Sequence, residues 1–287
     1  MAPEVVTFFD EGTNNATHLA IDPDQKACAI IDSLLDYDAA SGRTDTRSAD
    51  KVIDYIQKRG LDVQWIIDTH LHADHLSAAH YLKSKLGGAT AIGDRIADVQ
   101  KIFADIFGVE ASFRADGSQF GHLFKDGETY KVGNIEARAI HTPGHTPACM
   151  THVIGDAAFV GDTLFMPDFG TARCDFPGGD ARTLFRSIQK IFELPAETRI
   201  FLNHDYKAKG RDEYVWETTV GEEKQSNIHV GSGAAEDEFV KMRTERDATL
   251  AMPKLIIPSV QINMRAGEMP PPEDNDIRYI KVPINTL

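Results

Sequence analysis

Three histidines and one aspartate lie close together in the segment Thr69-His-Leu-His-Ala-Asp-His75. His70 and His72 are two residues apart, so in an extended stretch their side chains point to the same side. Asp74 and His75 are expected where the chain turns into a helix, and they can approach the same point from another direction. Imidazole and carboxylate groups together suit Zn²⁺, Fe²⁺ and Mn²⁺. The segment therefore predicts a metal site.

Three further candidate ligands follow later in the chain. His145 comes after a Thr-Pro-Gly turn, Asp162 lies in Val-Gly-Asp-Thr, and His204 lies in Asn-His-Asp-Tyr. Taken singly, each is explained by a turn, a cap or a buried core histidine. Their order and spacing make the set specific: a histidine some 70 residues after the first segment, an aspartate 17 residues later and a histidine about 40 residues after that.

These groups need a scaffold that delivers several chain segments to one place. Strand-like apolar runs are found at 27–31, 63–67, 135–139, 150–154, 157–160 and 199–202. Helical patterns are found around 52–56 (closed by Gly60) and at about 75–86, 95–107, 180–194 and 234–250. Several of the strand-like runs end in polar loops with His or Asp, which is how a rigid sheet positions a site on loops.

The composition restricts the kind of protein. A chain of 287 residues with 42% hydrophobic and 26% charged residues is expected to fold. Its net charge of −14 opposes binding to nucleic acid or to an anionic membrane. No apolar run approaches the roughly 18 residues of a membrane span. Three widely spaced cysteines and an N-terminus without signal-peptide features favour a soluble cytoplasmic protein.

The chain is expected to form one domain over residues 1–287. Six prolines fall between residue 253 and the C-terminus. We therefore expect residues 253–287 to form a Pro-rich C-terminal extension that wraps the domain in an extended conformation. Residues 207–230 are likewise expected to form an extended loop.

The ligand set as a whole resembles the metallo-β-lactamase superfamily, which implies an α/β (α+β) fold, a four-layer αββα sandwich with metals at one edge between the sheets. Within it the chain looks most like the persulfide (sulfur) dioxygenases, which are related to the glyoxalase II hydrolases. The finer match is carried by 69–75 with 143–147, by 161–162 with 173–176, and by 252–254 with 263–267. Similar Pro-Lys and Asn-Met-Arg-x-Gly segments are found near the C-terminus of the persulfide dioxygenases, whereas glyoxalase II ends in a different helical region.

The resemblance implies a catalytic Fe(II), one per chain, held by His70, His145 and Asp162. Two imidazoles and one carboxylate on one face make the facial triad of non-haem Fe(II) oxygenases. The remaining candidate ligands would surround this site or hold a second metal: His72, Asp74, His75 and His204. The implied reaction is oxidation of glutathione persulfide by O₂ to sulfite and glutathione, a step in sulfide detoxification.

The resemblance also suggests how the substrate and partners are bound. Arg173 suits a substrate carboxylate because its planar guanidinium binds such groups with two hydrogen bonds, and Tyr206 would line the site. The stretch between Asp162 and Arg173 looks longer than in the mitochondrial-type enzymes, so glutathione, coenzyme A or another small thiol stays open as the carrier. The family favours a homodimer, and any rhodanese-like sulfurtransferase partner would be a separate chain.

Two other functions stay open. All seven ligand positions are present, so a glyoxalase II-like thiolester hydrolase with Zn(II) or another binuclear site is the main alternative. A bridging hydroxide between two metals would be its nucleophile. The third hypothesis is a non-enzymatic sulfide or redox sensor, which the intact ligand set disfavours.

Overall fold

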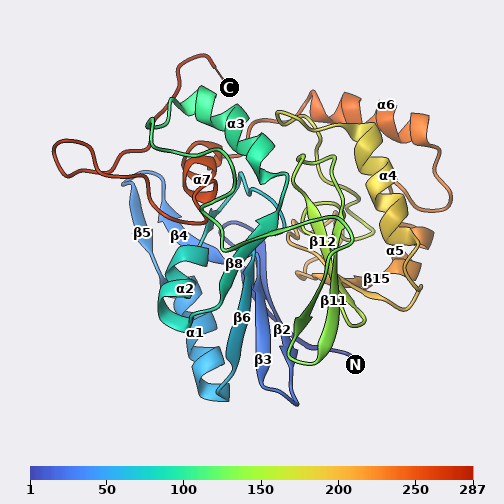
Figure 1. Ribbon diagram of the computed structural model, residues 1–287. Coiled ribbons are helices and arrows are strands. Elements are labelled where there is room, and N and C mark those ends of the chain that lie inside the picture. The colour runs from blue at the N-terminus through green and yellow to red at the C-terminus, as the bar shows by residue number, and fades with distance from the viewer. Residues whose placement is uncertain (287) are drawn as a thin grey trace.

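Two six-stranded sheets pack face to face in the computed structural model, which describes residues 1–286 (Figure 1). The strand order is β1-β2-β3-β6-β8-β9 in the first sheet and β10-β11-β12-β13-β14-β15 in the second. Helices α1 and α2 cover the outer side of the first sheet, and α4 to α6 lie on the outer side of the second (Figure 1). The predicted four-layer αββα sandwich is confirmed.

The strands of the first sheet are β1 (Glu4–Asp10), β2 (Asn15–Asp22), β3 (Ala27–Ile31), β6 (Asp62–Ile67), β8 (Ala89–Gly93) and β9 (His122–Phe124). Those of the second are β10 (Thr129–Val132), β11 (Ile135–His141), β12 (Met150–Ile154), β13 (Ala157–Phe159), β14 (Arg199–Phe201) and β15 (Glu217–Thr219). A small third sheet joins β4 (Leu34–Asp38), β5 (Arg43–Asp45) and β7 (Leu76–Ser77). The helices are α1 (Arg47–Arg59), α2 (Ala79–Leu86), α3 (Ile96–Phe107), α4 (Ala181–Phe192), α5 (Val220–Ser226), α6 (Glu236–Asp247) and α7 (Ile256–Asn263).

The burial of the strands explains their sequences. β2 and β3 lie inside the first sheet and are buried along their whole length. β3 is apolar throughout. β2 also contains four polar residues, and their buried side chains are hydrogen-bonded: Asn15, Thr17, His18 and Asp22. β11 instead alternates: Ile135, Ala137 and Ala139 are buried, while Glu136 and Arg138 between them are exposed. One face of β11 therefore packs against the first sheet and the other faces solvent.

Most predicted helices are confirmed within a few residues. The apolar positions of α1 are buried, and Gly60 caps its C-terminus in the left-handed conformation, with a φ of 63°. Asp180 caps α4 by accepting a hydrogen bond from the Thr183 backbone N–H. The helices predicted at 95–107 and 234–250 correspond to α3 and α6.

Three local predictions were wrong. The helix expected to start at His75 begins only at Ala79, because Leu76–Ser77 pair with β4 as strand β7. The expected loop at 207–230 contains β15 and α5. Residues 253–287 were expected to be extended, but they contain the helix α7. Residue 287 lies outside the described residues. Pro258 is tolerated because it lies in the first turn of α7, where a backbone N–H is not needed.

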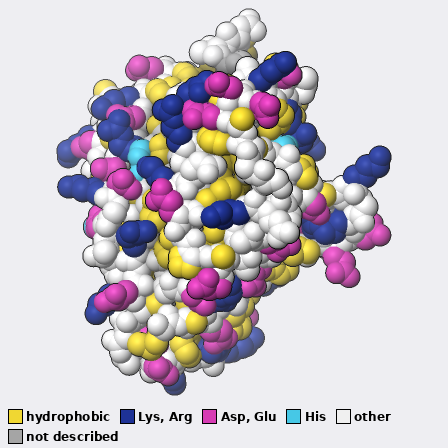
Figure 2. Space-filling view, turned by 90° about the vertical axis from the view of Figure 1, so that its right-hand side faces the viewer, with side chains coloured by type: hydrophobic (Ala, Val, Ile, Leu, Met, Phe, Trp, Pro, Cys, Tyr) yellow, Lys and Arg dark blue, Asp and Glu magenta, His cyan; other side chains and the backbone are white. Residues whose placement is uncertain are grey.

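The surface drawn in Figure 2 carries charges of both signs, and the three cysteines lie in the interior. On the face drawn in Figure 2, Lys and Arg side chains alternate with Asp and Glu instead of forming one basic area. Across residues 1–286, no helix combines the length and the apolar character needed to cross a membrane. Cys28, Cys149 and Cys174 are all buried, and none forms a disulfide within this part of the chain.

The polar loops that follow several strands meet at one edge of the sandwich. The 68–75 segment follows β6, the loop with His145 follows β11, Asp162 follows β13, and His204 follows β14. The first of these strands belongs to one sheet and the other three to the opposite sheet. The fold therefore brings the predicted ligands together from both sheets.

Candidate metal centre

The three residues of the predicted triad lie together and are buried. Their candidate ligand atoms all lie within 4.8 Å of one another. His70 Nε2 lies 3.8 Å from Asp162 Oδ2, and His145 Nε2 lies 3.6 Å from the same oxygen. These separations are too long for hydrogen bonds. They leave room for a cation between the three groups, with bonds of about 2.0–2.2 Å to each.

Hydrogen bonds orient both imidazoles of the triad. The Thr69 hydroxyl donates to Asp32 Oδ2 at 2.9 Å, so it accepts from His70 Nδ1 at 3.0 Å. His145 Nδ1 donates to the carbonyl oxygen of Arg173 at 2.7 Å. Each ring therefore directs an unprotonated Nε2 toward Asp162, as metal-binding histidines do. His70 Nε2 is buried without a hydrogen-bond partner in residues 1–286, which fits a metal ligand.

His72 lies between the triad and the second set, with its ring centroid 4.2 Å from those of both His70 and His75. Its Nε2 lies 3.0 Å from Asp32 Oδ1, so it donates a hydrogen bond to this carboxylate. Its Nδ1 is buried and has no hydrogen-bond partner within the described chain. The atoms of His72 that could bind a metal lie within 4.8 Å of those of Asp74 and His75. The structure thus brings His72 together with the second set of ligands.

Asp74 connects the second set to His204. Its carboxylate lies 3.3 Å from His75 Nδ1 and 3.0 Å from His204 Nε2. Burial would lower the pKa of His204, but the carboxylates of Asp74 and Asp162 outweigh this effect and raise the pKa to about 10. A second metal bound by His204 would therefore have to displace a proton.

Asp32 supports His70 and His72 of the first motif, a role that the sequence did not indicate. Its carboxylate accepts hydrogen bonds from the Thr69 backbone N–H at 2.7 Å, from the Thr69 hydroxyl and from His72. Its backbone is left-handed, with a φ of 53°, which is uncommon for a residue other than glycine. The only sequence signal was a polar residue directly after the apolar run at 27–31.

Gly161 allows the two sheets to approach at the triad. It has a φ of 54°, and a Cβ added there would collide with Thr69 Oγ1. Any larger residue would push Asp162 away from the segment that carries His70.

The C-terminal Asn-Met-Arg-Ala-Gly segment (263–267) holds the backbone of the first motif in place. The Asn263 side-chain amide donates to the carbonyl oxygens of His72 at 2.9 Å and His75 at 2.8 Å, and its oxygen accepts from the Ser77 N–H at 2.8 Å. Gly267 lies so close that an added Cβ would be 2.7 Å from the Ser77 carbonyl oxygen. The sequence identified this piece but gave no role for it.

Arg173 lies in the cavity wall and is already engaged. Its guanidinium donates to both oxygens of Asp175, at 2.6 and 2.7 Å, and to the Ala251 carbonyl oxygen at 2.6 Å. It also lies over the ring of Phe176, 5.0 Å from the centroid. Three of its five N–H donors are thus used within the chain, and substrate binding by Arg173 stays a prediction.

A buried ion pair on α6 holds the segment that contains Arg173. Arg243 contacts Asp247 at 2.5 Å and donates to the Thr171 carbonyl oxygen at 3.0 Å. Asp247 in turn accepts from the Cys174 N–H at 2.8 Å. The sequence predicted the helix but not this role, because the contacts depend on tertiary packing. The pair fixes the backbone on both sides of the carbonyl group that orients His145.

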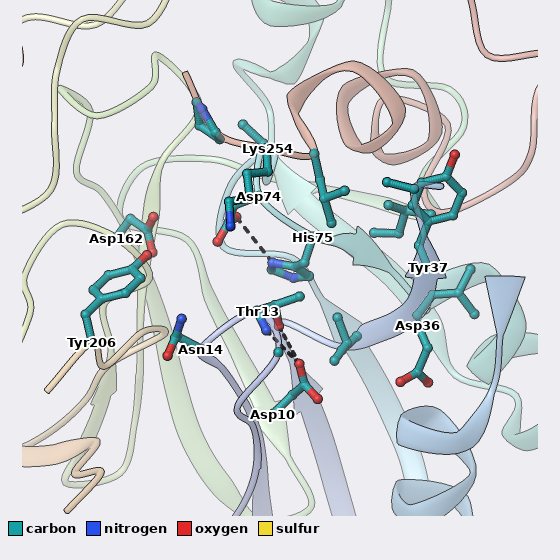
Figure 3. Close-up of a pocket in the computed structure, with 18 of the residues that line it drawn as sticks. Asp10, Thr13, Asn14, Asp36, Tyr37, Asp74, His75, Asp162, Tyr206 and Lys254 are labelled. Atoms are coloured by element: carbon teal, nitrogen blue, oxygen red, sulfur yellow. Dashed lines mark hydrogen bonds and ion pairs between the residues drawn. The ribbon is translucent and has the colours of Figure 1, made fainter. Parts of the chain in front are cut away.

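Tyr206 lies at the mouth of the cavity and is 40% exposed. Its ring stacks on that of His204, with centroids 5.7 Å apart and an interplanar angle of 18°. Phe165 and Phe169 contact its other sides. In Figure 3 its hydroxyl points toward Asp162. This position suits the predicted contact with a substrate, which stays a prediction.

A cavity of about 1080 Å³ opens onto the metal centre. Asp74, His75, His145 and Asp162 form part of its wall. Figure 3 shows Asp162 and Tyr206 on one side and Asp36 and Tyr37 of β4 on the other. The cavity is large enough for a ligand of tripeptide size.

Known proteins of two kinds are similar to this chain. Residues 11–204 match the family model described as "Metallo-beta-lactamase superfamily". A probable metallo-hydrolase of Burkholderia pseudomallei is 52% identical over 98% of both chains. Glyoxylase B2 of Dictyostelium discoideum is 52% identical over 94% of this chain and 92% of that protein.

Proteins named as persulfide dioxygenases are more distant but match over most of their length. The mitochondrial persulfide dioxygenase ETHE1 of Homo sapiens is 30% identical over 92% of this chain and 89% of that protein. The crystal structure of ETHE1 from Myxococcus xanthus has a TM-score of 0.73 at 27% identity, covering 92% of this chain and 100% of that one. Similarity thus extends both to proteins with hydrolase or glyoxylase names and to persulfide dioxygenases.

Proposed function

The chain belongs to the metallo-β-lactamase superfamily, and within it we propose that it is a persulfide dioxygenase that uses one Fe(II) to oxidise glutathione persulfide with O₂ to sulfite and glutathione. The observation that carries the proposal is that candidate ligand atoms of His70, His145 and Asp162 lie within 4.8 Å of one another, while His72 Nε2 is hydrogen-bonded to Asp32. Two imidazoles and one carboxylate are the ligands of non-haem Fe(II) oxygenases. The similarity to persulfide dioxygenases over most of the chain supports the same activity.

The residues of the chain would position the metal and the substrate. Iron bound by the triad would supply the oxygen chemistry. Thr69 and the Arg173 carbonyl oxygen hold the two imidazoles in the tautomer that presents Nε2. Phe165 and Tyr206 form an aromatic wall beside the triad, and they would exclude water from the reacting sulfur.

A binuclear thiolester hydrolase is the second candidate. It is favoured by the group of His72, Asp74 and His75, which lies beside the triad and could hold a second metal. The relatives at 52% identity carry hydrolase and glyoxylase names. In this case His204 would lose its proton and join the second metal site.

Metal content and oxygen uptake, measured together, separate the two candidates. The protein is purified without added metal and then given glutathione persulfide. We expect about one iron per chain, with oxygen consumption and sulfite release. Two metals per chain, or zinc without oxygen uptake but with hydrolysis of S-lactoylglutathione, would replace the dioxygenase by the hydrolase.

A further inference from the structure

The loop between β1 and β2 is joined to the metal centre through its last residue, Asn14. The backbone carbonyl oxygen of Asn14 accepts a hydrogen bond from His204 Nδ1 at 3.0 Å. The next residue, Asn15, forms an isolated β-bridge with His204. The Ala16 N–H then donates to the carbonyl oxygen of Asn203 at 2.8 Å. The loop is therefore fixed to the segment that follows β14 in the opposite sheet.

The conformation of this loop is defined within the loop itself. Asp10 Oδ2 accepts from the Thr13 backbone N–H at 2.8 Å and from the Thr13 hydroxyl at 2.9 Å, as Figure 3 shows. Asn14 has a φ of 56°, which lies in the left-handed region. Asparagine tolerates this region better than most residues, but glycine adopts it without strain. The turn alone therefore does not require a side chain at position 14.

The side chain of Asn14 faces the cavity beside the metal centre. It lines the same cavity as Asp162 and Tyr206. In Figure 3 its amide lies below these two residues, and no hydrogen bond joins it to another residue drawn there. His204 connects the three groups. Its Nδ1 donates to Asn14, its Nε2 lies 3.5 Å from Asp162 Oδ1, and its ring stacks on Tyr206.

The proposed reaction places negative charge on oxygen atoms close to these groups. A persulfide RSSH, O₂ and water give RSH, hydrogen sulfite and a proton. The S–S bond breaks, the two sulfur atoms together lose four electrons, and these electrons reduce O₂. Water supplies the third oxygen atom of the sulfite. Hydrogen-bond donors beside the triad would therefore face oxygen atoms that become more negative during the reaction.

We propose that the Asn14 side-chain amide, together with the Tyr206 hydroxyl, binds the oxygen atoms that the terminal sulfur acquires, an inference that rests on the proposed function. N–H and O–H donors that are already in position stabilise charge that develops on oxygen. The loop holds Asn14 in position before any substrate binds, through Thr13 on one side and His204 on the other. The ligand class of this site is a sulfur oxyanion.

Binding of inorganic sulfite tests this assignment without turnover. Asn14→Gly removes the amide but keeps the left-handed backbone and the carbonyl group that accepts from His204. Calorimetry on the full-length protein, with iron content measured and matched, should show sulfite binding about 10-fold more weakly to this variant than to the wild type. Asn14→Asp places a carboxylate there instead, so it should weaken binding further. Equal sulfite affinity in Asn14→Gly and the wild type would overturn the proposal.

A matched variant controls for the introduction of a glycine. Asn285 also has a left-handed backbone, with a φ of 57°, but it is exposed and does not line the cavity. Asn285→Gly should bind sulfite as the wild type does. An equal loss of affinity in Asn285→Gly would show that the effect does not come from the cavity, and the proposal would fail.

Kinetics separate this proposal from the proposed function. With glutathione persulfide, Asn14→Gly should lower kcat about 100-fold and change KM little, because the amide acts on oxygen atoms that form only during the reaction. A raised KM with unchanged kcat would assign Asn14 to the thiol carrier and overturn the proposal. A wild-type protein without oxygen uptake on any persulfide would refute the dioxygenase, and sulfite binding alone would then decide the role of Asn14.

Discussion

Residues 68–77 after β6 and residues 170–176 before α4 approach the metal centre from opposite sheets, and they are held in different ways. The first segment carries ligands itself, and its supports, Asp32 and Asn263, hydrogen-bond directly to those ligand residues. The second segment carries no ligand of the triad. It is held by the buried Arg243–Asp247 pair, and it reaches the metal centre only through the Arg173 carbonyl oxygen.

Metal affinity and the free energy of unfolding usually change together, but the two kinds of support should affect them separately. Supports of the first segment fix the ring orientation and basicity of metal ligands, so their loss should act mainly on metal affinity. Supports of the second segment are charges buried away from the metal, so their loss should act mainly on the free energy of unfolding. Variants in the two segments should therefore affect metal affinity and stability in different proportions.

The largest effect is expected for Asp247→Ala. This change leaves the buried Arg243 without its partner, which should lower the free energy of unfolding by about 3–5 kcal/mol. Denaturant unfolding measures the loss. The control is Asp237→Ala on the same helix, whose exposed pair with Arg182 should contribute less than about 1 kcal/mol. If Asp247→Ala lowers the free energy of unfolding no more than the control does, the charges of the Arg243–Asp247 pair do not support this segment.

A second buried group near this segment should make stability depend on pH. Burial raises the pKa of Glu223 to about 8, and Asn227 links its carboxyl group to the Gly170 carbonyl oxygen. The folded chain keeps a proton that the unfolded chain releases, so stability is highest below the unfolded pKa and falls as pH rises toward 8. Glu223 alone should contribute a decrease of about 3–4 kcal/mol between pH 5 and pH 8.

Glu223→Gln tests this pH dependence. Glutamine mimics the protonated acid, so the variant should lack the contribution of Glu223. The buried histidines should contribute equally to the pH dependence of the variant and the wild type. Glu222→Gln, at the exposed neighbouring position, should keep the pH dependence of the wild type. If the unfolding free energies of Glu223→Gln and the wild type change in parallel from pH 5 to pH 8, the assignment is refuted.

In the first segment, Asp32→Asn should act on the metal. The variant removes the negative charge that accepts from Thr69 and His72, so iron affinity should fall about 10- to 100-fold. Competition with a chelator measures it. Asp22→Asn removes another buried carboxylate of the same sheet, one that accepts only backbone N–H groups outside the metal centre. It should lower stability without changing iron affinity.

Sequence alone predicted the ligands better than their supports. The ligands are chemically distinctive and four of them lie within six residues, so their pattern is visible without a structure. The supports are ordinary residues far away in the chain: Asp32 lies 37 residues before Thr69, and Asp247 lies 73 residues after Cys174. Only the folded chain shows which of many similar carboxylates reaches the centre.

The same limit applies to the fold. Several buried strands and most of the amphipathic helices were predicted from their periodicity, and the layer order from the family resemblance. The buried strands β2 and β8 were not predicted. β1 was missed because all seven of its residues are half-buried, which gives no clear alternation. The helix start at His75 was wrong because a tertiary contact, the pairing of β7 with β4, overrides the local pattern.

The smallest effect is expected for Asn263→Ala, and it is the strictest test of the comparison. The variant removes three hydrogen bonds to the backbone of 72–77, which should cost about 1–2 kcal/mol of stability. Asn275→Ala, an exposed asparagine in the same C-terminal stretch, should change neither stability nor metal binding. Because His72 and His75 lose their backbone anchor beside the triad, metal affinity should also fall, by less than in Asp32→Asn. If Asn263→Ala lowers stability and leaves metal binding unchanged, the first segment behaves like the second, and the proposed division between them fails.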